Sequence, residues 1–447
     1  MNRVFIVEKF IYRVKYEKYE PSEDEIRFIG WILGQPTKKL DVIFSRYEQL
    51  FNRYVEKRCT KVDGNSICIY SWNQKTPFKV FPLTLHLYGT VILFSDNEPK
   101  EVLAYPIPKA LSYAKSPGVP QDEYCDRLPV EVTRRVDGWQ VTAYFNPVMN
   151  RWIFATRYVL HNMYFERGRL VIESIDSIAN PYVYVADRIA QEENVYKSLD
   201  RFRGWTFTFV LEGPEPAITK PPYPLGEDYR RYKLYILMAR DPNGRLYTWS
   251  ETSRLIPYRS PEYIEPKPLN TLYEEVLKRV ETRSYFAYIA TEDPENPMVI
   301  ELESEVYPEA MYVKYLYDAK SAALLITENI TDKLIEIIDD NAAKAVIKMK
   351  NYIDEFSSIL SSIDIHDAHS FAWKIVKVLS EYKEHVDISV EELTKILKER
   401  NMKRALRKVL SILLENSSLI SKETFENLGN FINNLKKQTL YRHNIHG

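Results

Sequence analysis

The chain carries few of the residue groupings that mark a known reaction. His366 and His369 have the HxxH spacing of a metal-binding pair, but no third ligand lies nearby, so we interpret them as surface histidines and predict no metal site. Cys59, Cys68 and Cys125 are odd in number and lack CxxC spacing, so we expect reduced, buried thiols without a disulfide or a zinc site. The sequence has no GxxxxGK[ST], GxGxxG, HExxH or GxSxG motif, which disfavours the P-loop NTPases and the hydrolases that use these motifs.

A series of short segments gives a more specific signal. In chain order they are Ile67–Asn73, Tyr88–Phe94, Tyr105–Lys109, Thr133–Trp139, Trp152–Arg157, Phe207–Val210, Leu237–Asp241 and Met311–Lys314. Their order, spacing and character resemble the ATP-dependent RNA ligases of the T-even phage type, which are covalent lysine nucleotidyltransferases. The phage-type enzymes similarly have a helical domain after the ligase core.

The resemblance places an arginine where the family has its nucleophile. In the family, the lysine of a K-x-D-G motif attacks the α-phosphate of ATP and forms lysyl-AMP, before AMP passes to an RNA 5′-phosphate. The corresponding residue here is Arg135, which is followed by the matching Asp137 and Gly138. The pKa of an arginine lies above about 12, so the neutral form is almost absent at pH 7. We therefore predict that Arg135 forms no covalent adenylate.

Other family motifs also depart from the pattern. The Arg-Gly, F-E-F, E-G and K-x-K motifs align with Tyr88-Gly89, Phe207-Thr208-Phe209, Arg283-Ser284 and Tyr312-Val313-Lys314. The family's metal-facing and ribose-facing carboxylates are thus replaced by Thr and Arg. Glu281 lies two residues before Arg283, so a shift in register would restore one carboxylate.

A set of cations survives these departures and is suited to holding phosphate. By resemblance, the catalytic positions are Arg135, Lys109 and Lys314, and the nucleotide-binding positions are Asp137, Gly138, Arg157 and Arg240. Lys61-Val62-Asp63-Gly64 is a perfect K-x-D-G, but it precedes the Tyr88 segment, opposite to the family's order. We interpret its Asp-Gly as the turn of a β-hairpin.

The pattern of apolar residues divides the chain into two parts. Residues 1 to about 325 are mostly strand-like, with β-branched and aromatic runs such as Thr206–Val210, and with a local helix over Thr271–Arg279. After Leu325 the apolar spacing becomes helical. The spacing of Ser389 and Glu392 predicts a capping box at the start of a helix that runs to about Arg400, and further helices are expected near 402–416 and 421–437. We predict an α+β fold: a ligase-type nucleotidyltransferase core of antiparallel sheets with helices over 1–325, and an all-α domain over 326–447.

Composition limits the class of protein further. The chain has 447 residues, 45% hydrophobic and 28% charged, which is typical of folded globular proteins. No apolar run is long enough to span a membrane and the N-terminus does not resemble a signal peptide, so we expect a cytoplasmic protein. The scarcity of Gly, with 13 residues, and the abundance of Tyr, with 33, suggest a thermophile. The net charge of −1 means that a nucleic acid must be held by a local basic surface.

These observations lead to one expected function and two alternatives. We expect an RNA ligase-like pseudoenzyme that binds nucleotide or RNA ends in a cationic groove, with RNA and ATP as ligands. The first alternative is an active ligase with a relocated nucleophile, which would use ATP and Mg²⁺. The second is a scaffold whose helical domain binds a protein partner.

Overall fold

The computed structural model describes residues 2–62, 64–73, 81–113, 115, 119, 121–160, 163–166, 169–172, 181–219, 229–291 and 297–440. The chain divides into two compact units. The first comprises Met1–Val276 and Ser284–Glu303, and the second comprises Leu277–Arg283 and Ser304–Gly447. Within the described residues, no helix is long and apolar enough to cross a membrane. That the domain boundary falls near residue 325 stays a prediction.

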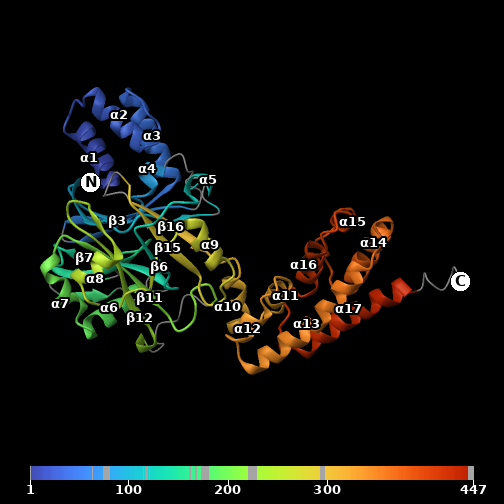
Figure 1. Ribbon diagram of the computed structural model, residues 1–447. Helices are drawn as coiled ribbons and strands as arrows, with labels where there is room; N and C mark the ends of the chain where they lie inside the picture. The colour runs from blue at the N-terminus through green and yellow to red at the C-terminus, as the bar shows by residue number, and fades with distance from the viewer. Residues whose placement is uncertain are drawn as a thin grey trace. The chain divides into compact units, whose positions relative to one another are not determined.

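The first unit begins with helices and a four-stranded antiparallel sheet (Figure 1). The helices are α1 (Arg3–Tyr16), α2 (Glu23–Ile32), α3 (Leu40–Arg53) and α4 (Phe81–Thr84). The strands are β1 (Val55–Val62), β2 (Asn65–Trp72), β3 (Tyr88–Ser95) and β4 (Glu98–Ala104), in that order across the sheet. Val4 and Val7 of α1 pack with Cys68 and Tyr70 of β2 in one apolar core.

The second sheet of this unit has the order β13-β12-β11-β7-β8 and is antiparallel. Its strands are β7 (Trp139–Asn146), β8 (Arg151–Thr156), β11 (Thr206–Glu212), β12 (Lys233–Arg240) and β13 (Leu246–Tyr247). Helices α6 (Pro181–Glu192), α7 (Val195–Leu199) and α8 (Trp249–Leu255) belong to the same region. Val183 and Ala186 of α6 share a core with Phe207 and Phe209 of β11, because alternate residues of the strand point to one face.

The third sheet has the order β14-β6-β15-β16-β5, in which only β16 and β5 are parallel. Its strands are β5 (Leu111–Ser112), β6 (Glu131–Arg134), β14 (Tyr263–Ile264), β15 (Ser284–Ile289) and β16 (Met298–Glu303). Helix α9 (Leu269–Leu277) packs Leu272 and Val276 against Val132 and Ala287. Helix α5 (Gln121–Tyr124) and the hairpin of β9 (Met163–Glu166) and β10 (Arg169–Ile172) complete the elements described.

The second unit is helical, and its helices from residue 331 onward follow the predicted periodicity. They are α10 (Tyr307–Leu316), α11 (Ala319–Thr327), α12 (Thr331–Ile335), α13 (Asp340–Ser361), α14 (Ala368–Leu379), α15 (Val390–Lys398), α16 (Met402–Leu413) and α17 (Lys422–Leu440). Ser389 caps α15, and its hydroxyl accepts a hydrogen bond from the Glu392 N–H at 3.1 Å. The predicted fold class is confirmed: antiparallel sheets with helices in the N-terminal part and an all-helical C-terminal region.

Two expectations were wrong. Residues 3–53 and 307–327 were interpreted as mostly strand-like because of their β-branched and aromatic residues. Their regular elements are the helices α1, α2 and α3 in the first range and α10 and α11 in the second. Cys59 and Cys68 form a disulfide, because the β1–β2 register places them directly opposite each other, and neither spacing nor count could reveal this register. Cys125 stays a free, partly buried thiol.

The hairpin that contains the perfect K-x-D-G is present. Val62 pairs with Asn65, so β1 and β2 are joined by two residues, and Lys61 lies opposite Ser66 with an exposed side chain. Asp63 lies outside the described residues. The three prolines of Lys220–Tyr229 predict a surface loop, and this segment also lies outside the described residues except for Tyr229.

Candidate functional site

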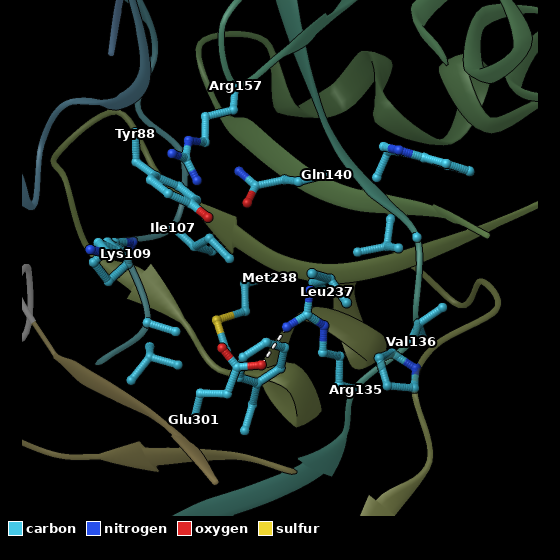
Figure 2. Close-up of a pocket in the computed structure, with 18 of the residues that line it drawn as sticks. Tyr88, Ile107, Lys109, Arg135, Val136, Gln140, Arg157, Leu237, Met238 and Glu301 are labelled. Atoms are coloured by element: carbon cyan, nitrogen blue, oxygen red, sulfur yellow. Dashed lines mark hydrogen bonds and ion pairs between the residues drawn. The ribbon is translucent and has the colours of Figure 1, made fainter. Parts of the chain in front are cut away.

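A cavity of about 470 Å³ opens in the first unit, lined by residues of both five-stranded sheets. Figure 2 shows Lys109, Arg135 and Arg157 among its lining residues, with Tyr88 and Gln140 between them. A volume of this size lies within the range of about 300 to 1,000 Å³ that is usual for small-molecule sites. The structure therefore brings together cations that are far apart in the sequence.

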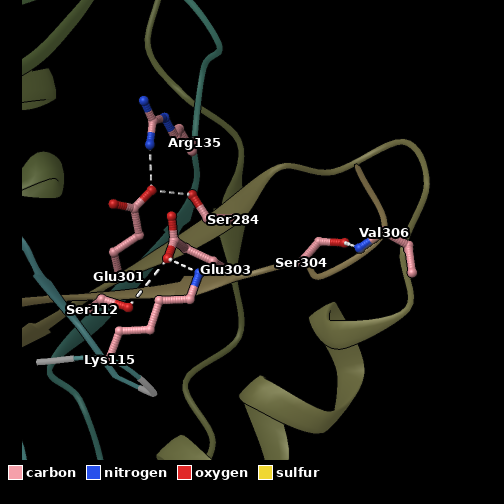
Figure 3. A network of polar contacts seen from close by, with 8 residues as sticks. All are labelled: Ser112, Lys115, Arg135, Ser284, Glu301, Glu303, Ser304 and Val306. Carbon is pink, nitrogen blue, oxygen red and sulfur yellow. Dashed lines mark hydrogen bonds and ion pairs between the residues drawn. The ribbon is translucent and has the colours of Figure 1, made fainter. Parts of the chain in front are cut away.

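Arg135 is held by a carboxylate from another strand. Its backbone N–H donates to the Ser284 carbonyl at 2.9 Å, which places the arginine one position beyond β6 and beside β15. Its guanidinium forms an ion pair with Glu301 of β16, and the same carboxylate accepts the Ser284 hydroxyl at 2.7 Å (Figures 2 and 3). Glu303, two residues further along β16, accepts from Ser112 and from Lys115, each at 3.2 Å.

The ion pair keeps Arg135 protonated. Burial disfavours the charged guanidinium, but the negative charges of Glu301 and, next, Asp137 outweigh this effect and raise the pKa of Arg135 above its usual value. An arginine so placed has no lone pair available for attack on phosphorus. Its charge is also largely offset by Glu301, so this side of the cavity offers little net attraction to phosphate.

Lys109 and Arg157 form a cation pair on the opposite side of the cavity. The Lys109 amine lies 4.0 Å from the centre of the Trp72 ring, and the Arg157 guanidinium lies 5.0 Å from the same ring and 4.3 Å from that of Tyr88. Burial, and after it the positive charge of Arg157, lowers the pKa of Lys109. The aromatic rings thus hold two like charges close together, at an electrostatic cost that a bound anion would relieve.

Several hydrogen-bond donors at the cavity are buried without a partner. They are Nε of Arg157, Nε2 of Gln140 and Nε1 of Trp249, none of which contacts an acceptor among the described residues. A buried donor without an acceptor is costly, so such groups commonly mark the position of a ligand or water. Nearby, the rings of Trp139 and Tyr182 stack at 4.4 Å, beside the apolar side chains of Leu237 and Met238.

Arg240 is buried and is not among the residues that line the cavity. The side chain is 2% exposed, and its guanidinium donates to the carbonyls of Tyr105 at 3.1 Å, Gly244 at 2.6 Å and Pro106 at 3.4 Å. The backbone around Lys109 is held further by two strand hydroxyls, because the Tyr105 N–H donates to Thr206 and the Ile107 N–H to Thr208. The Thr208 hydroxyl therefore helps to orient the segment that carries Lys109.

Gly138 lines the cavity at a position where a side chain would not fit. A Cβ at this position would lie 2.2 Å from the Leu211 carbonyl oxygen, so the backbones of β7 and β11 approach each other closely. Asp137, before it, acts on the site through its charge, which contributes to the raised pKa of Arg135. Gly89, in the segment with Tyr88, has φ +95 and contacts the backbone of Arg157, a conformation that favours glycine.

Lys314 is placed differently from the other predicted residues. It lies on helix α10 of the second unit, 5.6 Å from the Tyr315 ring, whereas every residue that lines the cavity belongs to the first unit. The Tyr312-Val313-Lys314 segment is therefore helical, and its role at the site stays a prediction.

Sequence reasoning missed Glu301, Ser284 and Gln140. A weak signal was present for Glu301, because Glu301 and Glu303 alternate with buried residues and so share one face of a strand. The pairing of Glu301 with Arg135 depends on the strand order β6-β15-β16, which no local pattern reveals.

The cavity does not fit a Mg²⁺ site built from protein carboxylates. Glu301 is its lining carboxylate and is already bound to Arg135 and Ser284, while Lys109 and Arg157 face the same space. Mg²⁺ prefers carboxylate and phosphate oxygens, and nearby cations oppose its binding. Within the described residues, no group of three or more His, Cys, Asp or Glu side chains could hold a metal ion.

Comparisons with known proteins give structural matches only. No protein-family model and no curated protein matches the sequence. The fold is similar to an archaeal ATP-dependent RNA ligase, with 14% identity, coverage of 70% of this chain and 69% of that one, and a TM-score of 0.39. It is also similar to a Naegleria gruberi RNA ligase variant with ATP and Mn, with 14% identity, coverage of 59% and 81%, and a TM-score of 0.30. At these low similarities, the arguments on function depend on the chain's own geometry.

Proposed function

We propose that the first unit binds a nucleotide or an RNA 5′-phosphate end in the cavity and does not transfer adenylate through Arg135. The observation that carries this proposal is that the two sides of the cavity differ in charge. Lys109 and Arg157 form a cation pair at one side, whereas Arg135 at the other is bound to Glu301. Phosphate would therefore bind between Lys109 and Arg157, where the Nε–H of Arg157 has no acceptor.

The rest of the cavity suits a nucleoside. Leu237 and Met238 give an apolar surface, and the stacked rings of Trp139 and Tyr182 offer a face for a base. The unpaired donors of Gln140 and Trp249 would bind acceptors of the base or ribose. Apolar walls with a few polar groups are typical of sites that bind a small ligand in one orientation.

We propose a positioning role for Arg240 in place of direct contact with nucleotide. Its guanidinium donates to carbonyls of the segment that leads to Lys109, so it fixes the position of the phosphate-binding amine. Asp137 has a comparable indirect role, since its charge helps to keep Arg135 protonated.

One observation favours the alternative of a relocated nucleophile. Lys109 is an amine at the cavity with a lowered pKa, and desolvated lysines beside another cation can act as nucleophiles. A labelled adduct that disappears in Lys109→Ala would support this alternative and contradict the binding-only proposal.

The proposal is tested by isothermal titration of the protein with AMP, which carries one phosphate and one base. Wild-type protein should bind AMP with one site, and Arg157→Ala should weaken binding about tenfold or more, since losing a hydrogen bond to a charged group costs about 1.5 to 3 kcal/mol. Lys61→Ala is the matched control, because this lysine is exposed on the β1–β2 hairpin. Absence of AMP binding by the wild type would refute the proposal.

A further inference from the structure

The second unit has a hollow of its own, formed where the first turns of α13 meet the start of α17. Its volume is about 560 Å³, and its lining residues are Tyr317, Asn341, Lys344, Ala345, Lys348, Ile420, Ser421, Lys422 and Phe425. We name it the α13/α17 hollow. The two helices run side by side in the same direction, as the ring contacts Tyr352–Phe425 and Phe356–Phe431 require (Figure 1).

Two of the lysines that line the hollow, Lys344 and Lys348, are not paired with a carboxylate in the described part of the chain. Some other lysines of this unit do form ion pairs, as in Lys350–Asp354 at 2.5 Å, Lys403–Glu328 at 2.7 Å and Lys408–Glu392 at 3.1 Å. Lys344 and Lys348 are exposed and, among the described residues, neither lies within ion-pair distance of a carboxylate. They are one helical turn apart, so their like charges repel and destabilise the free helix slightly.

Two carboxylates near the hollow, Asp339 and Glu426, are engaged by other groups. Asp339 caps α13 through the N–H groups of Asn341 and Ala342, and it also accepts the Tyr317 hydroxyl at 2.9 Å. Glu426 pairs with Lys422 at 2.9 Å. The described residues that line the hollow include lysines and no carboxylate. Because Lys422 is paired, the positive charge of the lining comes mainly from Lys344 and Lys348.

The floor of the hollow is apolar. Phe425 is 8% exposed and lies under Lys348, whose amine is 4.4 Å from the ring centre, and Ile420 beside it is 54% exposed. This arrangement holds the Lys348 amine at the rim, where it can reach a ligand that passes over the hollow. Neutral donors from Asn341 and Ser421 complete the lining.

We propose that the α13/α17 hollow binds the phosphodiester backbone of a single-stranded RNA. Two unpaired lysines at helical spacing match successive phosphates of a strand, and neutral donors between them can bind sugar or phosphate oxygens. An apolar floor beside the cations suits the unstacked bases of a single strand better than the closed surface of a duplex. This site lies wholly within the second unit and does not depend on the cavity that contains Arg135.

The experiment compares two ligands, an RNA oligonucleotide and AMP, on the full chain. Binding of a 5′-hydroxyl oligonucleotide of uridines reports on the hollow, while binding of AMP reports on the cavity of the first unit. The test variant is the double substitution Lys344→Gln and Lys348→Gln, which keeps helix propensity at two exposed positions. The control is Lys395→Gln with Lys398→Gln, which removes the same charge from exposed positions of α15.

In the test variant the Kd for the oligonucleotide should rise at least tenfold at low salt. The slope of log Kd against log salt should also fall by about 1.4, since each phosphate contact on a single strand contributes about 0.7. AMP binding should be unchanged in both variants. Equal oligonucleotide affinity of the test and control variants, or no oligonucleotide binding by the wild type, would overturn the proposal. If the wild type bound polyglutamate as tightly as the oligonucleotide, the proposal would be overturned in favour of an acidic protein partner.

Discussion

At the scale of single residues, the account depends on which cations are offset by a carboxylate. Arg135 is bound to Glu301, whereas burial and the neighbouring Arg157 lower the pKa of Lys109. The first arrangement favours a permanently charged, unreactive group, and the second favours an amine that gains from binding an anion.

Incubation of the wild type with α-³²P-labelled ATP and Mg²⁺ should give no labelled protein band on a denaturing gel, because Arg135 has no free lone pair. Arg135→Lys alone should not produce ligation of 5′-phosphorylated RNA. A lysine at this position would pair with Glu301, which raises its pKa and keeps the amine protonated. A labelled wild-type band would contradict this account, and its loss in Lys61→Ala would identify the other K-x-D-G lysine as the nucleophile. RNA sealing by the single Arg135→Lys variant would refute the second expectation.

The lowered pKa of Lys109 predicts a pH dependence of AMP binding. The AMP phosphate is fully ionised above about pH 7.5, so Lys109 is the group at the phosphate whose charge changes next. A bound phosphate favours the protonated form of Lys109, so the complex holds more protons than the free protein. The affinity for AMP is therefore highest below the pKa of Lys109 in the free protein, and it falls as the pH rises through that pKa. This fall should occur below the usual lysine value of about 10.4. Titrations between pH 7.5 and 10 should show it in the wild type and not in Lys109→Arg, and a level wild-type profile would count against a phosphate-binding Lys109.

At the scale of elements, the site depends on how strands hold the segment that precedes Lys109. Arg240 of β12 and the hydroxyls of Thr206 and Thr208 of β11 bind the backbone of residues 105–107. The cation Lys109 is therefore positioned by a neighbouring sheet, although the residue itself lies outside regular structure.

Arg240→Met should lower the free energy of unfolding by at least about 3 kcal/mol, because it leaves buried carbonyls without donors, each at a cost of about 1 to 3 kcal/mol. Urea denaturation measures this loss. Arg245→Met is the control, since Arg245 makes an exposed ion pair with Glu251 and should contribute about 1 kcal/mol or less. Equal stability of the two variants would show that Arg240 does not hold the segment.

The elements also show how far the sequence could predict the structure. The strands β3, β11 and β12 and the helices after residue 325 were predictable, because β-branched runs and apolar spacing are local signals. Helix α1 was missed because its Val, Ile and Phe residues favour strands, yet packing against the four-stranded sheet and capping by Asn2 stabilise a helix. The cations of the cavity were anticipated through a resemblance, but the partner of Arg135 comes from a strand distant in sequence and required the sheet order.

At the scale of the whole molecule, binding depends on local charge. The chain has 61 Lys and Arg against 62 Asp and Glu, so its overall field does not attract nucleic acid. Two positive sites in the described part of the chain are the Lys109–Arg157 side of the cavity in the first unit and the proposed α13/α17 hollow in the second. Each site has its own proposed ligand, a nucleotide or 5′-phosphate end for the first and a strand backbone for the second, so the two can be tested separately.

The most direct test of the central claim is the titration of AMP into wild-type protein, Lys109→Ala and the control Lys61→Ala at pH 7.5. We predict saturable binding with one site in the wild type, about tenfold or more weaker binding in Lys109→Ala, and unchanged binding in the control. Equal affinity of all three proteins, or no heat of binding with the wild type, would contradict the claim that Lys109 and Arg157 form a phosphate site in this cavity.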